Sequence, residues 1–234
     1  MPVDLNVDLG ELPNEPEELY ALATVVNIAC GGHAGVEASM KRAVELARSH
    51  GVRIAAHPSY PDREGFGRRS LKLPPSALYE AVVEQCDTLV QIAREMGARV
   101  ELVKLHGALY HDAARDPSIA AAVLDGVVSA LPDGPVIVGP GHGVLAPAAE
   151  ARALPYAREG FADRRYDPNG DLVPRSSPNA LIEDPSEAAE QAVRLARSGA
   201  FDTICVHGDT RGAVDIAQAV RDALTRENLL RIAR

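Results

Sequence analysis

The sequence predicts an α/β fold, a TIM-like (β/α)7 barrel in which parallel strands alternate with helices. Seven short apolar runs each stop at or just before polar or charged residues, and a helical stretch follows most of them. The turn after the first run has neither a G-x-G-x-x-G pattern nor a Walker lysine, which argues against a doubly wound nucleotide-binding sheet. At 234 residues, 46% of them hydrophobic, the chain suits one domain, and we expect a single barrel over residues 1–234.

The expected strands are short and rich in β-branched residues, as strands buried on both faces should be. They lie at residues 3–8, 24–29, 52–56, 100–103, 136–139, 156–161 and 203–206. The carboxyl ends of parallel strands meet at one end of a barrel, which is where barrels hold their active sites. Because ionisable residues follow all seven runs, their convergence there indicates an enzyme or part of one.

Apolar residues at helical spacing predict the helices between the strands. They are expected at about residues 36–47, 75–96, 185–198 and 211–225. Asp116-Pro117 and Asp184-Pro185 each place a capping carboxylate before a proline at the first helical position, and Glu187 completes a capping-box pattern at the second. Between residues 155 and 181, Gly, Pro and charged residues predict a long loop, and long loops in compact domains are usually functional.

Composition narrows the partners and the compartment. The net charge is −9, and acidic and basic residues are interspersed without a basic stripe, which argues against nucleic acid as a partner. No apolar run reaches membrane-spanning length, and the first residues lack a signal-peptide pattern. Cys30, Cys86 and Cys205 form no CxxC pair, as is typical of a reducing compartment. We expect a cytoplasmic protein that binds neither nucleic acid nor a membrane.

Polar and apolar residues alternate in the first strand, so Asp4, Asn6 and Asp8 point to the same side. Unpaired polar side chains packed against the helices would be destabilising, which favours the barrel lumen. Asp8 is therefore a candidate for chemistry at the strand end, with Glu11 in the turn that follows. The alternative is that Asp8 only caps this turn.

The turn after the second strand joins Asn27, Cys30 and His33 to a pair of glycines. Glycines let a ligand approach backbone N–H groups near a helix N-terminus, which suits an anionic or carbonyl group. The alternative is an ordinary tight turn with His33 at the surface.

His57, Lys104 and His106 stand at the ends of the third and fourth strands. An imidazole in such a position serves as a metal ligand or general base, or is simply hydrogen-bonded in the core. Lys104 and His106 share a strand face, and Lys104 is expected to pair with a carboxylate or act on a carbonyl or phosphoryl oxygen, unless it only reaches into solvent. Arg68 is expected to hold a carboxylate or phosphate, or to pair with a surface acid.

The last strand repeats the pattern, because His207 and Asp209 share a face and Thr210 stands where it would cap the last helix. After the sixth strand, Asp163 and Arg164 either bind substrate or form a salt bridge that orders the long loop.

Six segments together resemble the LamB/YcsF family, the A subunits of ATP-dependent 5-oxoprolinase. They are DLNVDLGE at 4–11, NIACGGHAG at 27–35, HPSYPDREGFGRR at 57–69, VKLHGALY at 103–110, EGFADRRY at 159–166 and VHGDT at 206–210. The resemblance extends over nearly the whole chain, and six segments in the same order are far more specific than one. The loop after Glu11 is shorter than is usual in the family.

The resemblance implies a seven-stranded barrel of the glycoside hydrolase/deacetylase type that opens 5-oxo-L-proline to L-glutamate, using ATP and partner subunits B and C. Since the chain has no recognisable nucleotide loop, we expect that ATP handling requires a partner. The catalytic candidates are Asp8, His57, Lys104, His106 and Asp209. The candidates for binding the small lactam are Asn6, Glu11, Asn27, His33, Arg68, Tyr110, Asp163, Arg164 and His207. His111 and His142 are left outside the predicted site.

Two alternatives stay open. One is a metal-dependent deacetylase or other hydrolase on the same barrel, with Asp8, His57 and His106 holding Mg²⁺ or another divalent metal. The other is a non-catalytic subunit that binds a lactam for its partners. One pocket at the carboxyl-end mouth of the barrel should be lined by Asp8, Glu11, His33, His57, Lys104, His106, His207 and Asp209. Lys104 should stay charged through a carboxylate within ~4–6 Å, with Asp8 and Asp209 as the expected partners.

Overall fold

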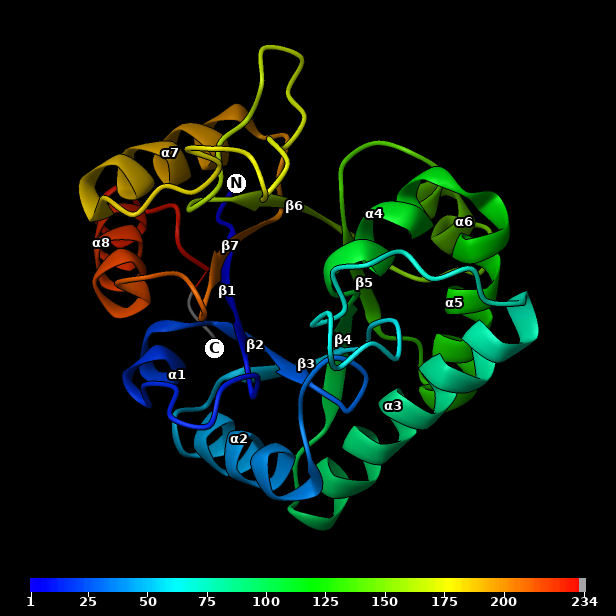
Figure 1. Cartoon of the computed structure of the whole chain (residues 1–234). Coiled ribbons are helices and arrows are strands. Elements are labelled where there is room, and N and C mark those ends of the chain that lie inside the picture. Colours follow the sequence, from blue (N-terminus) through cyan, green and yellow to red (C-terminus); the bar gives the residue numbers. More distant parts are fainter. Residues whose placement is uncertain (232–234) are drawn as a thin grey trace.

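Seven parallel strands close into one barrel in the computed structural model, which describes residues 1–231 (Figure 1). The strands are β1 (Asp4–Leu9), β2 (Val25–Ala29), β3 (Arg53–His57), β4 (Val100–Lys104), β5 (Val136–Gly139), β6 (Tyr156–Phe161) and β7 (Thr203–His207). The helices are α1 (Glu18–Leu22), α2 (Glu37–Ser49), α3 (Pro75–Glu95), α4 (Gly107–Arg115), α5 (Pro117–Ala130), α6 (Leu145–Glu150), α7 (Pro185–Ser198) and α8 (Ala213–Arg226). Strands neighbour one another in chain order, and β1 pairs with β7 to close the barrel. The predicted fold class is confirmed.

Because polar and apolar residues alternate in β1, its polar side chains point into the barrel and its apolar side chains pack under the helices, as predicted. Leu5, Val7 and Leu9 belong to the main hydrophobic core under the helices. Asn6 and Asp8 point into the lumen, where they reach side chains of strands across the barrel. A smaller apolar cluster lies inside the barrel nearer its amino end, formed by Val25, Ala55, Leu102 and Val138. This cluster lies below the polar groups of the upper lumen, and Asp4 with Arg53 forms a separate polar pair at the amino end.

Four strands end one residue later than predicted, and three of them end at His57, Lys104 and His207. Strand register fixes these positions: Ala29 pairs with His57, Lys104 with Val138 and Asp8 with His207. The backbone of each ionisable residue is thus held by the sheet, which makes its side chain more precisely placed than one on a free loop.

The predicted helix caps are present. Asp116 accepts a hydrogen bond from the backbone N of Ser118 at 2.8 Å, and Asp184 accepts one from the backbone N of Glu187 at 2.8 Å. The capping box at α7 is only half formed, because the Glu187 side chain pairs with Arg165 instead of returning to the cap.

Thr210 does not cap the last helix, contrary to the prediction. Helix α8 begins at Ala213 after Gly212, which adopts the left-handed conformation with φ of 74°. The Thr210 hydroxyl instead donates to Asp163 at 2.7 Å.

The long loop between β6 and α7 folds back over the mouth of the barrel (yellow-green to yellow in Figure 1). Antiparallel bridges join Arg164 to Leu181 and Tyr166 to Leu172, so the loop forms an ordered hairpin-like excursion. Strand β6 is complete up to Phe161, and the loop therefore starts later than residue 155, where it was expected.

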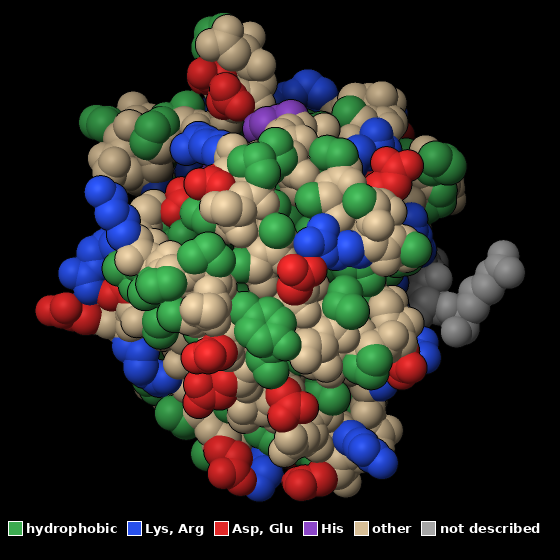
Figure 2. All heavy atoms as spheres, turned by 90° about the vertical axis from the view of Figure 1, so that its right-hand side faces the viewer, with side chains coloured by type: hydrophobic (Ala, Val, Ile, Leu, Met, Phe, Trp, Pro, Cys, Tyr) green, Lys and Arg blue, Asp and Glu red, His purple; other side chains and the backbone are tan. Residues whose placement is uncertain are grey.

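On the face shown in Figure 2, acidic and basic side chains are interspersed among apolar ones. Within residues 1–231, no helix combines the length and the apolar character that crossing a membrane requires. The three cysteines are buried and unpaired.

Candidate active site

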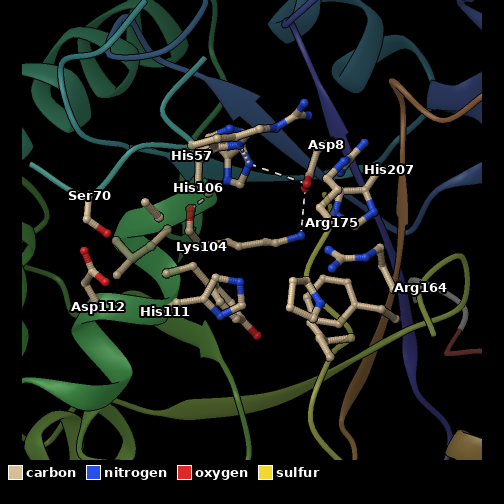
Figure 3. Close-up of a pocket in the computed structure, with 18 of the residues that line it drawn as sticks. Asp8, His57, Ser70, Lys104, His106, His111, Asp112, Arg164, Arg175 and His207 are labelled. Atoms are coloured by element: carbon tan, nitrogen blue, oxygen red, sulfur yellow. Dashed lines mark hydrogen bonds and ion pairs between the residues drawn. The ribbon is translucent and has the colours of Figure 1, made fainter. Parts of the chain in front are cut away.

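A cavity of about 750 Å³ opens at the carboxyl end of the barrel (Figure 3). Strand ends form its floor, the start of α4 forms one wall, and the loop between β6 and α7 forms the other. Eight of the predicted site residues line it: Asp8, His57, Arg68, Lys104, His106, Tyr110, Arg164 and His207. The predicted convergence at one mouth is therefore present for these residues.

Lys104 is buried at the floor of the cavity between two carboxylates. Its Nζ lies 2.8 Å from Asp8 Oδ1 and 3.0 Å from Glu159 Oε1. Burial alone would lower the pKa of Lys104, but the Asp8 carboxylate, together with Cys205 and Glu159, outweighs burial and holds that pKa well above its usual range. Burial would likewise raise the pKa of Asp8, and Lys104 holds it well below its usual range. Both groups are ionised at neutral pH.

The second expected partner of Lys104 was wrong. Asp209 pairs with Arg68 and with Arg175, at 2.7 Å from the latter, on the rim of the cavity. These two guanidinium groups hold the Asp209 carboxylate away from the floor, and Glu159 takes its place beside Lys104.

Asn6 and Asn27 lie under the floor and connect its charged groups. The Asn27 amide donates to Asp8 Oδ1 and to Asn6 Oδ1, both at 2.7 Å, and the Asn6 amide donates to Glu159 Oε1 at 3.0 Å. Neither side chain lines the cavity. Both position the carboxylates through these hydrogen bonds, and the substrate-binding role expected for them stays a prediction.

His57 and His106 form a pair, and their backbone partners show which ring nitrogens carry a hydrogen. His57 Nδ1 lies 2.7 Å from the carbonyl O of Lys104, and His106 Nε2 lies 3.0 Å from the carbonyl O of Phe66. A carbonyl only accepts, so both nitrogens carry the hydrogen. The remaining nitrogens, His57 Nε2 and His106 Nδ1, face each other at 3.0 Å. Two lone pairs cannot be stable so close together, and a proton or a cation must lie between them.

Glu11 and His33 stand behind this pair and do not line the cavity, and the substrate-binding role expected for both stays a prediction. Glu11 Oε1 lies 3.2 Å from His106 Nδ1 and 3.0 Å from His33 Nε2. Burial would raise the pKa of Glu11, but these hydrogen bonds lower it, while burial lowers the pKa of His33 to about 4. Glu15 fixes the short loop by accepting from the Glu11 backbone N at 3.2 Å.

Glu11, His33, His57 and His106 have donor atoms close enough to hold a metal ion. Donors that share one ion with bonds of about 2.1 Å lie roughly 3.0–3.4 Å apart. His106 Nδ1 meets this spacing with both His57 Nε2 at 3.0 Å and Glu11 Oε1 at 3.2 Å, while His57 Nε2 and Glu11 Oε1 are slightly farther apart, at 3.7 Å. The His33 ring is stacked parallel on His106 at 3.6 Å, and one ion cannot lie in both ring planes. Asp8, expected as a ligand, is 3.5 Å from His57 Nε2 and groups with Cys205 and His207 instead. A nitrogen-rich set suits transition metals better than Mg²⁺.

Asp163 is buried outside the cavity and orients His207. Its carboxylate accepts from His207 Nδ1 at 2.9 Å, from the His207 backbone N at 3.0 Å and from Thr210 at 2.7 Å. Burial would raise the pKa of Asp163, but these donors lower it. Asp163 therefore positions His207 and does not pair with Arg164, while the substrate contact expected for it stays a prediction.

Several groups at the cavity escaped the sequence prediction. Phe161, Arg175 and His111 are examples on the walls, and Glu159 lies beneath the floor beside Lys104. Strand alternation places Glu159 on the same face as Phe161, so this signal was available. His111 was left out although it follows Tyr110 directly on α4. His142 is exposed and lies outside the cavity.

Comparison with known proteins places the chain among close relatives. The sequence profile of the LamB/YcsF family matches residues 3–233. A protein from Methylococcus capsulatus, named as the A subunit of 5-oxoprolinase, is 43% identical over 97% of this chain and 94% of its own length. A protein of the same name from Streptomyces avermitilis is 44% identical over 95% of each chain.

Two solved structures resemble this chain, one over nearly its whole sequence and one in its fold alone. The lactam utilization protein from Thermus thermophilus has a TM-score of 0.90 at 36% identity, covering 98% of both chains. The catalytic domain of a peptidoglycan N-acetylglucosamine deacetylase from Eubacterium rectale has a TM-score of 0.55 at 12% identity, over 99% of this chain and 88% of its own, which shows a shared barrel fold. With a family profile and relatives that match over nearly its full length, this chain belongs to the LamB/YcsF family.

Proposed function

We propose that this chain is the A subunit of an ATP-dependent 5-oxoprolinase, which opens 5-oxo-L-proline to L-glutamate together with partner subunits B and C in the cytoplasm. The names of its relatives support this proposal. The observation that carries it is the charged Lys104 at the floor of the cavity, held between Asp8 and Glu159 beside the His57–His106 pair. A fixed cation next to a proton-transferring pair is what the opening of an amide ring needs.

The chemistry follows from amide resonance, which makes a lactam carbonyl a poor target for water. Phosphorylation of the amide oxygen by ATP makes the ring carbon electrophilic. Water then adds to that carbon, the C–N bond breaks and the ring nitrogen takes up a proton, which leaves an acyl phosphate. A second water releases phosphate and L-glutamate. Lys104 stabilises the negative charge on the oxygen in these steps, because a preorganised cation is most effective where charge develops.

Asp8 or His57 takes the proton from water, since both line the cavity. Asp8 is ionised at neutral pH and orients the water. Burial would lower the pKa of His57, but the Asp8 and Glu11 carboxylates outweigh burial and raise it. If His57 is the base, activity rises with pH above its ordinary pKa of about 6.5. If Asp8 is the base, activity is flat there.

ATP is handled together with a partner protein. The turn after β1, residues 8–11, has none of the glycine-rich sequence that cradles phosphates. The isolated chain should therefore release no phosphate from ATP in the presence of 5-oxo-L-proline.

Reconstitution of the three subunits tests the proposal, with release of L-glutamate as the readout. Asp8→Asn should abolish glutamate release while the variant still folds, because the substitution keeps the shape of the side chain. Asp4→Asn is the matched control: Asp4 lies on the same strand near its amino end, paired with Arg53 and Arg231. Full activity of the Asp8→Asn mixture would contradict catalysis at this cavity and favour a lactam-binding scaffold.

A metal-dependent hydrolase is the second candidate, and the facing nitrogens of His57 and His106 favour it. With Glu11 they would hold a divalent transition metal, which when bound polarises a carbonyl or lowers the pKa of water. Elemental analysis of the purified chain, and the visible spectrum after addition of Co²⁺, test this without any assay of activity. One equivalent of metal, lost in His106→Asn but kept in the control His142→Asn, supports a metal. No bound metal and no Co²⁺ spectrum would mean that the pair shares a proton.

A further inference from the structure

The Arg164 guanidinium is buried in the wall of the cavity without a carboxylate partner in residues 1–231. The residue is 6% exposed, one terminal nitrogen donates to the carbonyl O of Val173 at 2.7 Å, and Nε has no hydrogen-bond partner. Burial, and then the charge of Arg175, lowers the pKa of Arg164, but an arginine stays charged at neutral pH. A buried charge with an open donor is costly unless a ligand completes it.

The backbone around Arg164 is fixed, although the residue belongs to the long loop. Arg164 forms a bridge with Leu181, and its carbonyl O accepts from the Gln191 side chain at 2.6 Å. In Figure 3 the side chain extends into the cavity. The guanidinium is thus held in place before a ligand arrives, which lowers the entropic cost of binding.

The other charges around the cavity leave Arg164 unmatched. Asp209 is shared by Arg175 of the same loop and by Arg68 of the segment between β3 and α3, so three guanidinium groups and one carboxylate lie on this side of the cavity. Asp163, the neighbour of Arg164, already accepts three hydrogen bonds from His207 and Thr210. At the floor, by contrast, Lys104 faces two carboxylates, which repel an anion. The two sides of the cavity therefore favour different parts of a ligand: an anionic group at the wall and a neutral carbonyl at the floor.

We propose that Arg164 binds the carboxylate of the substrate, so that the cavity selects a lactam bearing a carboxylate over the same ring without one. This inference rests on the proposed function for the identity of the ring. The Arg164 guanidinium already donates one hydrogen bond to Val173, and its remaining donors match one carboxylate through charge-assisted hydrogen bonds. A phosphate group would call for further cations close by, but Asp209 holds Arg68 and Arg175, and Arg115 lies exposed at the far end of α4. With the carboxylate on Arg164, the ring carbonyl is free to face Lys104.

Calorimetric titration of the full chain with two matched rings tests the inference. The rings are 5-oxo-L-proline and 2-pyrrolidinone, which differ by the carboxylate alone. Arg164→Met should weaken binding of 5-oxo-L-proline by about 10- to 100-fold, the range for a lost hydrogen bond to a charged group, and leave 2-pyrrolidinone unchanged. Arg164→Lys should recover only part of the loss, because the planar fork is gone. Arg165→Met is the matched control, since Arg165 pairs with Glu187 away from the cavity.

Thermal unfolding without ligand separates binding from folding. Because the buried charge of Arg164 has no partner, Arg164→Met should unfold at or above the wild-type temperature. Equal binding of 5-oxo-L-proline to Arg164→Met and the wild type would overturn the inference, as would an equal loss for both rings. Tighter, Arg164-dependent binding of inorganic phosphate would assign the site to a phosphoryl group and also overturn it.

Failure of the proposed function gives a different result. The wild type could bind neither ring but bind L-glutamate or glutarate in an Arg164-dependent way. That result would support the carboxylate site on Arg164 and contradict a lactam as the substrate. If the wild type binds no carboxylate at all, the inference is wrong.

Discussion

Removal of the Lys104 charge should be among the most destabilising single changes at the floor of the cavity. The two contacts of 2.8 and 3.0 Å are each worth roughly 6 kcal/mol of attraction at an effective dielectric constant of about 20. The desolvation of three buried ions cancels much of this attraction. Lys104→Met leaves two buried carboxylates facing each other, and breaking a buried pair in this way costs about 3–5 kcal/mol. We expect the free energy of unfolding to fall by that amount at pH 7.

Urea denaturation of the folded chain measures the change. Lys41→Met is a matched control, because Lys41 forms an exposed i,i+4 pair with Glu37 and its loss should leave the unfolding curve in place. The double variant Lys104→Met, Glu159→Gln should recover a large part of the loss, since only Asp8 then remains charged without its lysine.

The pH dependence gives the prediction its sign. In the wild type, Lys104 holds the pKa of Asp8 below its ordinary value, so this contribution to stability is present above that value and is lost as pH falls through the folded pKa. In Lys104→Met, burial should raise the folded pKa of Asp8 above its unfolded value. The variant should therefore become relatively more stable as pH falls from 7 to 5, and its deficit should shrink. A deficit below about 1 kcal/mol, or one that does not change with pH, would refute the charge network described here.

Three further perturbations test the surroundings of the site. Gly107→Ala should lower the free energy of unfolding by more than about 2 kcal/mol, because a Cβ there would lie 2.4 Å from the carbonyl O of Gly67 at a φ of 57°. Gly199→Ala, in open space at a φ of 69°, should lower it by about 1 kcal/mol. Equal losses in urea denaturation would contradict the clash at Gly107. The pKa of His33 in the folded chain is lowered to about 4, so the stability from its neutral ring is present above pH 6.5 and is lost as pH falls towards 4. His33→Gln should therefore make the free energy of unfolding fall less steeply over that pH range. An unchanged slope would contradict this role of His33. Burial raises the pKa of Cys30 to about 12 and the pKa values of Cys86 and Cys205 well above their ordinary value. A disulfide reagent at pH 8 should therefore modify the three thiols only after denaturation. Rapid labelling of the native chain would contradict the structure.

The barrel was predictable because its strands obey a rule that is local in sequence. Each strand is a short, mostly apolar run with an ionisable residue at its end or in the segment that follows, and the direction of Asp8 and Asn6 follows from alternation alone. The short helices α1, α4 and α6 were not predicted, since five, nine and six residues leave little periodicity to detect.

The site was predictable where a side chain stands at a strand end, as with His57 and Lys104, and less so where partners come from far away. Glu159 was missed because it lies inside its strand run, two residues before the end that drew attention. Arg175 belongs to a loop whose path depends on tertiary bridges, and its capture of Asp209 could not be foreseen from spacing. The placement of Glu11 and His33 behind the His57–His106 pair likewise depends on tertiary packing, which residue spacing does not reveal.

A crystal structure of the chain soaked with 5-oxo-L-proline tests the central claim most directly, because it shows where the ring lies before any partner protein takes part. We predict that the ring occupies the cavity, with its carbonyl oxygen within hydrogen-bond distance of Lys104 Nζ and its carboxylate on the guanidinium of Arg164. A ring bound outside the cavity, or one inside it with the carbonyl turned away from Lys104, would contradict the account.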